Sequence, residues 1–204
     1  MKTLQELTNY KNENHLRDLQ TLKLGRNYFY YNEIDSTQKE IWRRIEKNQI
    51  VDGTLIRAEK QTAGIGTHGR KWVSTTNNIA FSFYAELNCK LEKLEGITVE
   101  IAEIIINLIK EMYGIQLDIK LPNDIYFGGK KLGGILTETK VKGNLAKCMV
   151  VGIGINNSQI NFVGELNNIA SSVKKEFGIE IEVEKFISYL CNRFEKIITN
   201  RIED

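Results

Sequence analysis

Charged residues, a rigid turn and glycines, which leave the backbone uncovered, lie together in one stretch of the sequence. This stretch is KLPNDIYFGGKKLGGILTET at residues 120–139. Pro122, the only proline in the chain, fixes its own φ and pushes the residue before it toward an extended conformation. Asn123 and Asp124 therefore leave the turn in a defined direction, so the directions of both polar side chains are set by the turn. We interpret this stretch as a site for a nucleotide and a carboxylate.

A β-hairpin is predicted to follow this turn. A Gly-Gly pair at 128–129 is a two-residue turn signal between strand-like segments, and the returning strand carries Lys130 and Lys131. A solvated lysine pair is the alternative interpretation of those cations. A second Gly-Gly pair, at 133–134, stands inside the returning strand, where it weakens side-chain packing. We therefore expect a ligand to approach the backbone there.

The loop EKQTAGIGTHGRKWVSTTNN at residues 59–78 contains GIGTHG, which matches a GxGxxG pattern. In dinucleotide-binding proteins that pattern opens a helix, whereas here a polar run and a strand follow. The glycines are thus predicted to belong to a loop whose amides wrap an anion. Arg70, Lys71 and Trp72 supply groups that a phosphate and a purine would use. A plain surface loop is the alternative.

A third segment, VVGIGINNS at residues 150–158, is predicted to be a buried strand that ends in small residues and Asn156. Gly152 and Gly154 are explained most simply as bulges or tight packing points. The alternative is that they form the wall of a binding pocket.

Composition limits the class of protein but does not identify a function. The chain has 204 residues, 42% hydrophobic and 26% charged, which suits one domain with a sizeable core. A net charge of +2 is too small to indicate a nucleic-acid partner. The three cysteines and two histidines have no metal-ligand spacing, so no metal site is predicted.

The same sequence favours a soluble, cytoplasmic protein with reduced thiols. Its N-terminus is polar, without the apolar segment of a signal peptide, and no apolar run reaches the roughly 18 residues of a membrane span. Oligomeric state stays open, a homodimer included, because a self-complementary sheet edge cannot be recognised in one sequence.

Helical and strand patterns are mixed without strict βαβ alternation, which favours an α+β fold with a mixed, largely antiparallel sheet and helices packed on one face. Thr37 and Glu40 fit a capping box at the start of the first helix, and Gly114 is a natural C-cap for the second. The predicted helices cover residues 37–48, 98–114 and 182–202, after one or two short ones within 2–22. The predicted strands cover 27–35, 54–61, 77–87, both sides of the turn at 128–129, and 144–156.

Four segments, in order, resemble the catalytic domain of the biotin protein ligases, also called biotin-[acetyl-CoA-carboxylase] ligases. GIGTHGRKW resembles their GRGRxGRxW loop, and KLPNDIYFGGKKLGGILTE resembles their KWPND(x)nKxxGIL segment. VVGIGIN resembles their GIGIN strand, and EIDSTQKE resembles the EIDSTN entry to the biotin pocket. The resemblance covers residue 25 to about residue 190, and it implies an N-terminal lead-in at 1–25 and a ligase-type catalytic domain at 26–204.

The resemblance implies an ATP-dependent ligase that acts in two steps. Biotin and MgATP give biotinyl-5'-AMP and pyrophosphate, and the biotinyl group then passes to a lysine of a biotin carboxyl carrier protein. Lys131, which would meet the biotin carboxylate and the α-phosphate, is the best single catalytic candidate. Arg70 would bind phosphate, and Asp124 would either accept the proton of the incoming lysine or orient a substrate. Mg²⁺ would arrive with the nucleotide.

Two sets of contacts follow from the same resemblance. Hydroxyls and amides suit the neutral ureido ring of biotin, while glycines let the backbone approach it. The implied biotin contacts are Ser36, Thr37, Gln38, Gln61, Gly64, Lys131, Gly134 and Gly152. The implied nucleotide contacts are Arg70, Trp72, Asn123, Asp124 and Asn156. Because Thr37 also suits a simple N-cap, Ser36 is the safer of the two hydroxyls.

The sequence departs from the family pattern at several points. Ile65, Thr67 and His68 stand where the family loop usually has cations, and we hypothesise weaker retention of the adenylate. Leu121 replaces the tryptophan of KWPND. The end of the chain at Asp204 and its short N-terminus imply a short form, without the family's C-terminal cap domain and without a DNA-binding domain.

Two rival functions remain. Lipoate or octanoate protein ligases share the fold and a comparable lysine, but their usual RRxGGG loop is absent from this sequence. A non-catalytic biotin-binding protein is the alternative from another class. It is opposed by the presence of Lys131, Asn123, Asp124 and Arg70.

Overall fold

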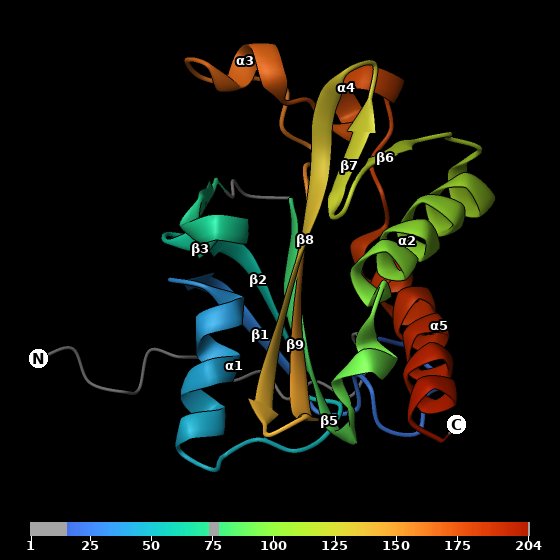
Figure 1. The fold of residues 1–204 in the computed structure, drawn as a ribbon. Helices are drawn as coiled ribbons and strands as arrows, with labels where there is room; N and C mark the ends of the chain where they lie inside the picture. Colours follow the sequence, from blue (N-terminus) through green and yellow to red (C-terminus); the bar gives the residue numbers. More distant parts are fainter. Residues whose placement is uncertain (1–15, 74–77, 204) are drawn as a thin grey trace, which may run out of the picture.

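A mixed, mostly antiparallel sheet of seven strands forms the centre of a computed structural model, which describes residues 16–73 and 78–203 (Figure 1). The strand order is β1-β2-β5-β9-β8-β7-β6, with β1 parallel to β2 and every other pair antiparallel. The strands are β1 (Tyr28–Ile34), β2 (Leu55–Gln61), β5 (Ile79–Lys90), β6 (Asp118–Lys120), β7 (Asp124–Phe127), β8 (Lys130–Lys142) and β9 (Leu145–Ile155). The α+β class with a largely antiparallel sheet is therefore confirmed.

Helices cover both faces of this sheet, so the prediction that they pack on one face was wrong. The long helices α2 (Ile97–Tyr113) and α5 (Val183–Glu203) pack on one face, and α1 (Thr37–Glu46) packs on the other (Figure 1). The reason is visible in α1 itself. Ile41 is fully buried, and Trp42 and Ile45 pack beside it, so this helix brings its own apolar stripe to the second face.

Two hydrophobic clusters result from the alternation of side chains along the central strands. Phe81 and Phe83 of β5 belong to the large core under α2 and α5, whereas Tyr84 belongs to the small core under α1. On β9, Val151 and Val150 divide in the same way. The small core under α1 covers only one end of its face, and the glycines Gly152 and Gly154 lie toward the other end of β9.

Local signals at the ends of elements account for most predicted boundaries. Gly114 caps α2 in a left-handed conformation, as expected. The Gly-Gly pair at 128–129 has φ values of +56° and +78°, which matches the two-residue turn predicted between β7 and β8. The helix α1 begins at Thr37, as predicted, but its N-cap is Ser36 and not Thr37, and Ser36 accepts a hydrogen bond from the backbone N of Lys39.

Several short elements were not predicted from the sequence. The loop after β2 contains a small hairpin, β3 (Gly64–Ile65) and β4 (Lys71–Trp72), around a 3₁₀ turn, η2 (Thr67–Gly69). A second 3₁₀ turn, η3 (Leu91–Leu94), precedes α2, and two short helices, α3 (Leu166–Ile169) and α4 (Val173–Phe177), follow β9. Along with β6, each has at most five residues, too few for a periodic pattern to show.

The predicted lead-in falls mostly outside the described residues, since its helices were expected within 2–22. Its described part, residues 16–27, forms turns and contains no helix. Leu16 and Leu24 are buried in the large core, and Glu195 of α5 accepts hydrogen bonds from the backbone N–H groups of Leu22, Lys23 and Leu24. From residue 16 onward this segment packs on α5; the domain boundary after residue 25 stays a prediction.

Candidate active site

A cavity of about 310 Å³ opens on the α1 face of the sheet, beyond the N-terminus of α1. It is lined by the β3–β4 hairpin, the glycine-containing ends of β8 and β9, and the segment from Gln159 to Ala170. Among the site residues predicted from the sequence, those lining the cavity are Ser36, Thr37, Gln38, Gln61, Arg70, Trp72, Asn123, Asp124, Lys131, Gly134, Gly152 and Asn156. Four segments far apart in the sequence thus meet in one place.

Gly64 is the exception. It lies in β3 opposite Trp72, and a Cβ there would come within 2.7 Å of the Trp72 carbonyl oxygen. The absence of a side chain at Gly64 lets two backbones pair closely in the hairpin, and Gly64 does not line the cavity. The sequence-based role of Gly64, close approach to biotin, therefore disagrees with where this residue lies.

The cavity floor consists of residues that the strand register brings side by side. Gly134 of β8 pairs with Asp124 on one side and with Gly154 on the other. Gly152 pairs with Ser82 of β5. Because alternate residues of a strand share a face, these positions all face α1 rather than the large core. Glycine there lets the side chains of Trp72, Lys131 and Gln38 lie directly on the strands.

Trp72 lies directly on this floor. A Cβ built on Gly154 would come within 2.5 Å of the indole Cε2, so only glycine admits the ring in this position. The indole Nε1 is buried and has no hydrogen-bond partner among the described residues. An unpaired donor in a cavity wall is costly unless a ligand or water accepts from it, which fits a wall built for a bound molecule.

Lys131 and Asp124 form an ion pair beside Trp72 on the same floor. Lys131 Nζ lies 2.6 Å from Asp124 Oδ1 and 5.9 Å from the centre of the Trp72 ring. A Cβ on Gly134 would come within 3.2 Å of Lys131 Nζ, so the lysine lies across the bare backbone of its own strand. The ammonium group is held at the cavity, where an anionic ligand group can reach it.

Thr37 and Gln61 form a second polar group, at the N-terminus of α1. The Gln61 Oε1 accepts from the Thr37 backbone N at 2.8 Å and from its Oγ1 at 3.1 Å. The Thr37 Oγ1 is also 2.8 Å from the Ser82 Oγ. Of the two hydroxyls, Thr37 is thus in the polar cluster and Ser36 is the N-cap. Both residues line the cavity, and the preference for Ser36 as a biotin contact stays a prediction.

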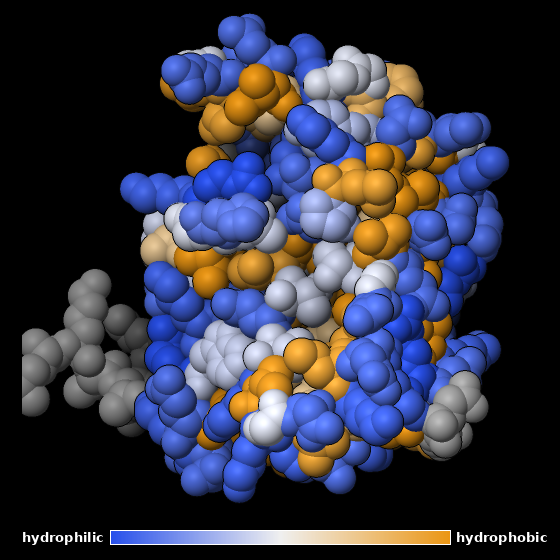
Figure 2. All heavy atoms as spheres, viewed as in Figure 1, coloured by the Kyte–Doolittle hydropathy of each residue, from blue (hydrophilic) through white to orange (hydrophobic). Residues whose placement is uncertain are grey.

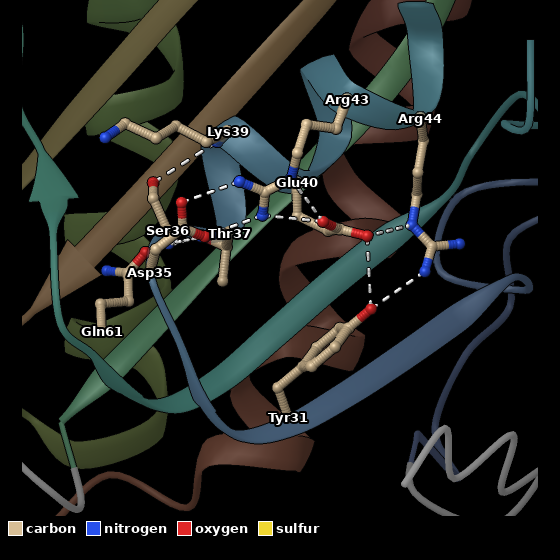
Figure 3. A network of polar contacts seen from close by, with 9 residues as sticks. All are labelled: Tyr31, Asp35, Ser36, Thr37, Lys39, Glu40, Arg43, Arg44 and Gln61. Atoms are coloured by element: carbon tan, nitrogen blue, oxygen red, sulfur yellow. Dashed lines mark hydrogen bonds and ion pairs between the residues drawn. The ribbon is translucent and has the colours of Figure 1, made fainter. Parts of the chain in front are cut away.

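An ionic network holds the turn that presents these groups (Figure 3). Arg43 binds both carboxylate oxygens of Asp35, and Asp35 Oδ1 also accepts from the backbone N of Ser36 at 2.8 Å. The hydrogen bond from Arg43 holds the pKa of Asp35 below its usual value. Glu40 bridges Arg43 and Arg44 on the same helix. The first turn of α1 is therefore fixed from outside the cavity.

Asn123, Asn156 and Arg70 already have partners within the protein. Asn123 Nδ2 donates to the Ile135 carbonyl at 3.1 Å, and Asn156 Nδ2 donates to the Ser171 carbonyl at 3.0 Å. Arg70 is exposed at the cavity mouth and donates to the Thr67 hydroxyl at 2.7 Å. The two asparagines therefore brace the loops around the cavity, each with its amide oxygen as the remaining polar group.

The structure adds lining residues that sequence reasoning missed. Ser82 carried a usable signal, since it is the one serine inside the largely apolar run IAFSFYAEL. Phe162, Leu166 and Ile169 carried none, because the segment around α3 has no periodic pattern. Figure 2 shows hydrophobic residues of this segment above a hollow. Hydrophilic residues over β3 lie below the same hollow.

Three observations limit the chemistry. Within residues 16–73 and 78–203 no three His, Cys, Asp or Glu side chains gather as a metal site, and no helix there is long and apolar enough to cross a membrane. Cys89, Cys148 and Cys191 are buried free thiols, and burial raises the pKa of Cys148. A thiolate nucleophile is thus disfavoured.

A family model described as the biotin/lipoate A/B protein ligase family matches residues 30–156, more than half of the sequence. The chain belongs to this family. The bifunctional ligase/repressor BirA of Bacillus subtilis is 38% identical over 181 residues, which cover 87% of this chain and 55% of that protein. The biotin--[acetyl-CoA-carboxylase] ligase of Paracoccus denitrificans is 28% identical over 153 residues, covering 69% of this chain and 61% of that protein.

Among solved structures, the biotin protein ligase of Aquifex aeolicus in complex with biotin and ATP superposes with a TM-score of 0.71 at 26% identity. The match covers 88% of this chain and 73% of that one. The chain spans 55% of the length of the Bacillus subtilis relative. The family and the fold are thus shown.

Proposed function

We propose that this chain is a biotin protein ligase that activates biotin with ATP and transfers it to a lysine of a biotin carboxyl carrier protein. The observation that carries the proposal is the content of one cavity. Lys131 supplies a cation at one end, while Thr37, Gln38, Gln61 and Ser82 supply neutral hydrogen-bonding groups at the other. Biotin has the same polarity, with a carboxylate at one end and a neutral ureido ring at the other.

Lys131 is the proposed catalytic cation. Adenylation brings the biotin carboxylate to the α-phosphate of ATP, so two anions must meet and more negative charge develops during the reaction. A positive charge about 4 Å away contributes roughly 4 kcal/mol at an effective dielectric near 20. Asp124 Oδ1 lies 2.6 Å from this ammonium group and keeps it at the cavity.

The nucleotide would lie at the β3–β4 side of the cavity. Trp72 offers an indole face, Arg70 a guanidinium for phosphate, and the braced Asn123 and Asn156 offer amide oxygens. Asp124 is the one acidic side chain among the described lining residues. A single carboxylate is a weak metal site, which fits Mg²⁺ that is carried by the phosphates of ATP.

Transfer requires the acceptor lysine of the carrier protein to lose a proton. Asp124 is the proposed acceptor of that proton once Lys131 has turned toward the adenylate; the alternative role of Asp124 is to orient the substrate. Neither step needs nucleic acid or a membrane, and reduced thiols at all three cysteines fit the proposed cytoplasmic location.

The test is pyrophosphate–ATP exchange with biotin, lipoate or octanoate as the only carboxylic acid, because exchange needs no carrier protein. Wild type is compared with Lys131→Ala and with Lys130→Ala, its neighbour on the same strand, as the matched control. We expect biotin-dependent exchange that Lys131→Ala abolishes and Lys130→Ala retains. Dependence on lipoate would reassign the substrate within the family, and biotin binding without exchange would favour a non-catalytic binding protein.

A further inference from the structure

Gln38 is held at the cavity floor with one end of its amide unused. Its Nε2 donates to Glu138 Oε2 at 2.8 Å and to the Val150 carbonyl at 3.3 Å. The side chain is 3% exposed, and its Oε1 has no hydrogen-bond partner among the described residues. A buried amide oxygen without a donor is unfavourable unless something in the cavity supplies one.

The direction of this amide is fixed by chemistry. A carboxylate oxygen and a carbonyl oxygen can only accept here, so the NH₂ group of Gln38 must point toward Glu138 and Val150. Glu138 is itself held by Trp42, whose Nε1 donates to the same Oε2 at 2.7 Å. Trp42 stands one turn after Gln38 on α1, and Glu138 lies on β8, so the helix and the sheet together define the arrangement.

The free Oε1 of Gln38 lies over Gly152. A Cβ on Gly152 would come within 2.7 Å of this oxygen and within 3.2 Å of the Ser82 Oγ. Gly152, Gln38 and Ser82 all line the cavity. The absence of a side chain at Gly152 therefore makes room for the Gln38 amide, which places a hydrogen-bond acceptor in the cavity wall.

Gln61 is fixed in the opposite direction. Its Oε1 accepts from the backbone N of Thr37, which can only donate, so its NH₂ group is the free end. The two glutamines thus offer one acceptor and one donor of fixed direction. A cyclic urea needs both, since its N–H groups donate and its carbonyl accepts.

We infer that Glu138 is a positioning residue for ligand recognition. Together with Trp42 it fixes the Gln38 amide, so that Oε1 accepts a hydrogen bond from an N–H of the neutral head group of the ligand. Glu138 does not line the cavity and acts only through Gln38. The identification of that head group as the ureido ring of biotin rests on the proposed function.

The test measures biotin and ATP affinity separately, by calorimetry, in wild type, Glu138→Leu, Glu138→Gln and Trp42→Phe. We expect Glu138→Leu to weaken biotin binding about tenfold, the scale of one lost hydrogen bond, and to leave ATP binding unchanged. Glu138→Gln keeps an oxygen that can accept from both donors and should stay close to wild type. Trp42→Phe removes a donor to Glu138 but not the contact to Gln38, and should fall between the two.

A second measurement needs no variant. Wild type should bind biotin at least about tenfold more tightly than biotin methylated at the ureido nitrogens, because a methyl group removes the donor that Gln38 requires. Equal affinity for both ligands, or unchanged biotin affinity in a folded Glu138→Leu variant, would overturn the inference while biotin binding itself stands. Wild type that binds no biotin at all would instead overturn the proposed function, and this inference with it.

Discussion

The two faces of the sheet are formed by the same strands but serve different purposes. The face under α2 and α5 is packed along its length with large side chains such as Phe83, Phe186 and Phe194, all 1% exposed or less. The face under α1 is packed at one end only, and its other end carries Gly134, Gly152 and Gly154. A core and a cavity thus lie on opposite sides of the same backbone.

This difference shows how a site is made from a strand pattern. Alternation sends every second residue of β8 and β9 to the α1 face, and glycine at those positions lets Trp72, Lys131 and Gln38 reach the backbone without disturbing the layer behind. The packed face stabilises the fold, and the open face leaves room for a ligand. Substitutions on the two faces should therefore affect different properties.

The largest effect is expected on the packed face. Phe83→Ala removes a fully buried ring that contacts the ring of Phe194 at a centroid distance of 5.3 Å. We expect a loss of about 3–5 kcal/mol in the free energy of unfolding, from lost burial and the cavity left behind. Chemical denaturation measures it. A loss below about 1 kcal/mol would mean that this face is not the main source of stability.

A smaller effect, on binding rather than stability, is expected on the open face. In Gly154→Ala the new Cβ meets the rigid indole of Trp72 at 2.5 Å, whereas in Gly134→Ala it meets the flexible end of Lys131 at 3.2 Å. We expect Gly154→Ala to displace the indole, change tryptophan fluorescence and weaken ATP binding about tenfold or more. Gly134→Ala is the matched control and should weaken it less. Equal ATP affinity in wild type and Gly154→Ala would show that the Trp72 indole is not part of the nucleotide site.

The smallest effect is expected at the network that supports the open face. The pKa of Asp35 is lowered in the folded protein by Arg43, so this pair stabilises the fold above the pKa of Asp35 in the unfolded chain, near pH 4. That contribution is lost as the pH falls through the lower folded pKa. Asp35→Asn should therefore cost at most about 1 kcal/mol at pH 7, because the pair is partly exposed, and less at pH 3. Denaturation at both pH values measures it; an equal cost at pH 3 would contradict an ionic origin.

The sequence predicted the parts of this arrangement that depend on short-range signals. The turn at 128–129, the cap at Gly114 and the strand patterns of β5, β8 and β9 follow from backbone preference and alternation. The resemblance to biotin protein ligases then predicted site residues in four segments. All of these residues except Gly64 line one cavity.

What the sequence did not predict depends on contacts between distant residues. The apolar stripe of α1 is visible in the sequence, but the face of the sheet on which this stripe packs depends on contacts with distant strands such as β5 and β9. Thr37 bonds Gln61 and Ser82, both far along the chain, while Ser36 caps α1. Glu138 is an ordinary acidic residue in a strand until Gln38 and Trp42 are brought to it.

The most direct test of the central claim, that biotin binds in the cavity on the α1 face, is a calorimetric titration of biotin into wild type and Gly152→Ala. The added methyl group would come within 2.7 Å of the Gln38 Oε1 and 3.2 Å of the Ser82 Oγ, so the Gln38 amide would have to move. We predict one biotin site in wild type, and at least about tenfold weaker binding in Gly152→Ala with an unchanged unfolding midpoint. Equal biotin affinity in the two proteins would contradict the claim.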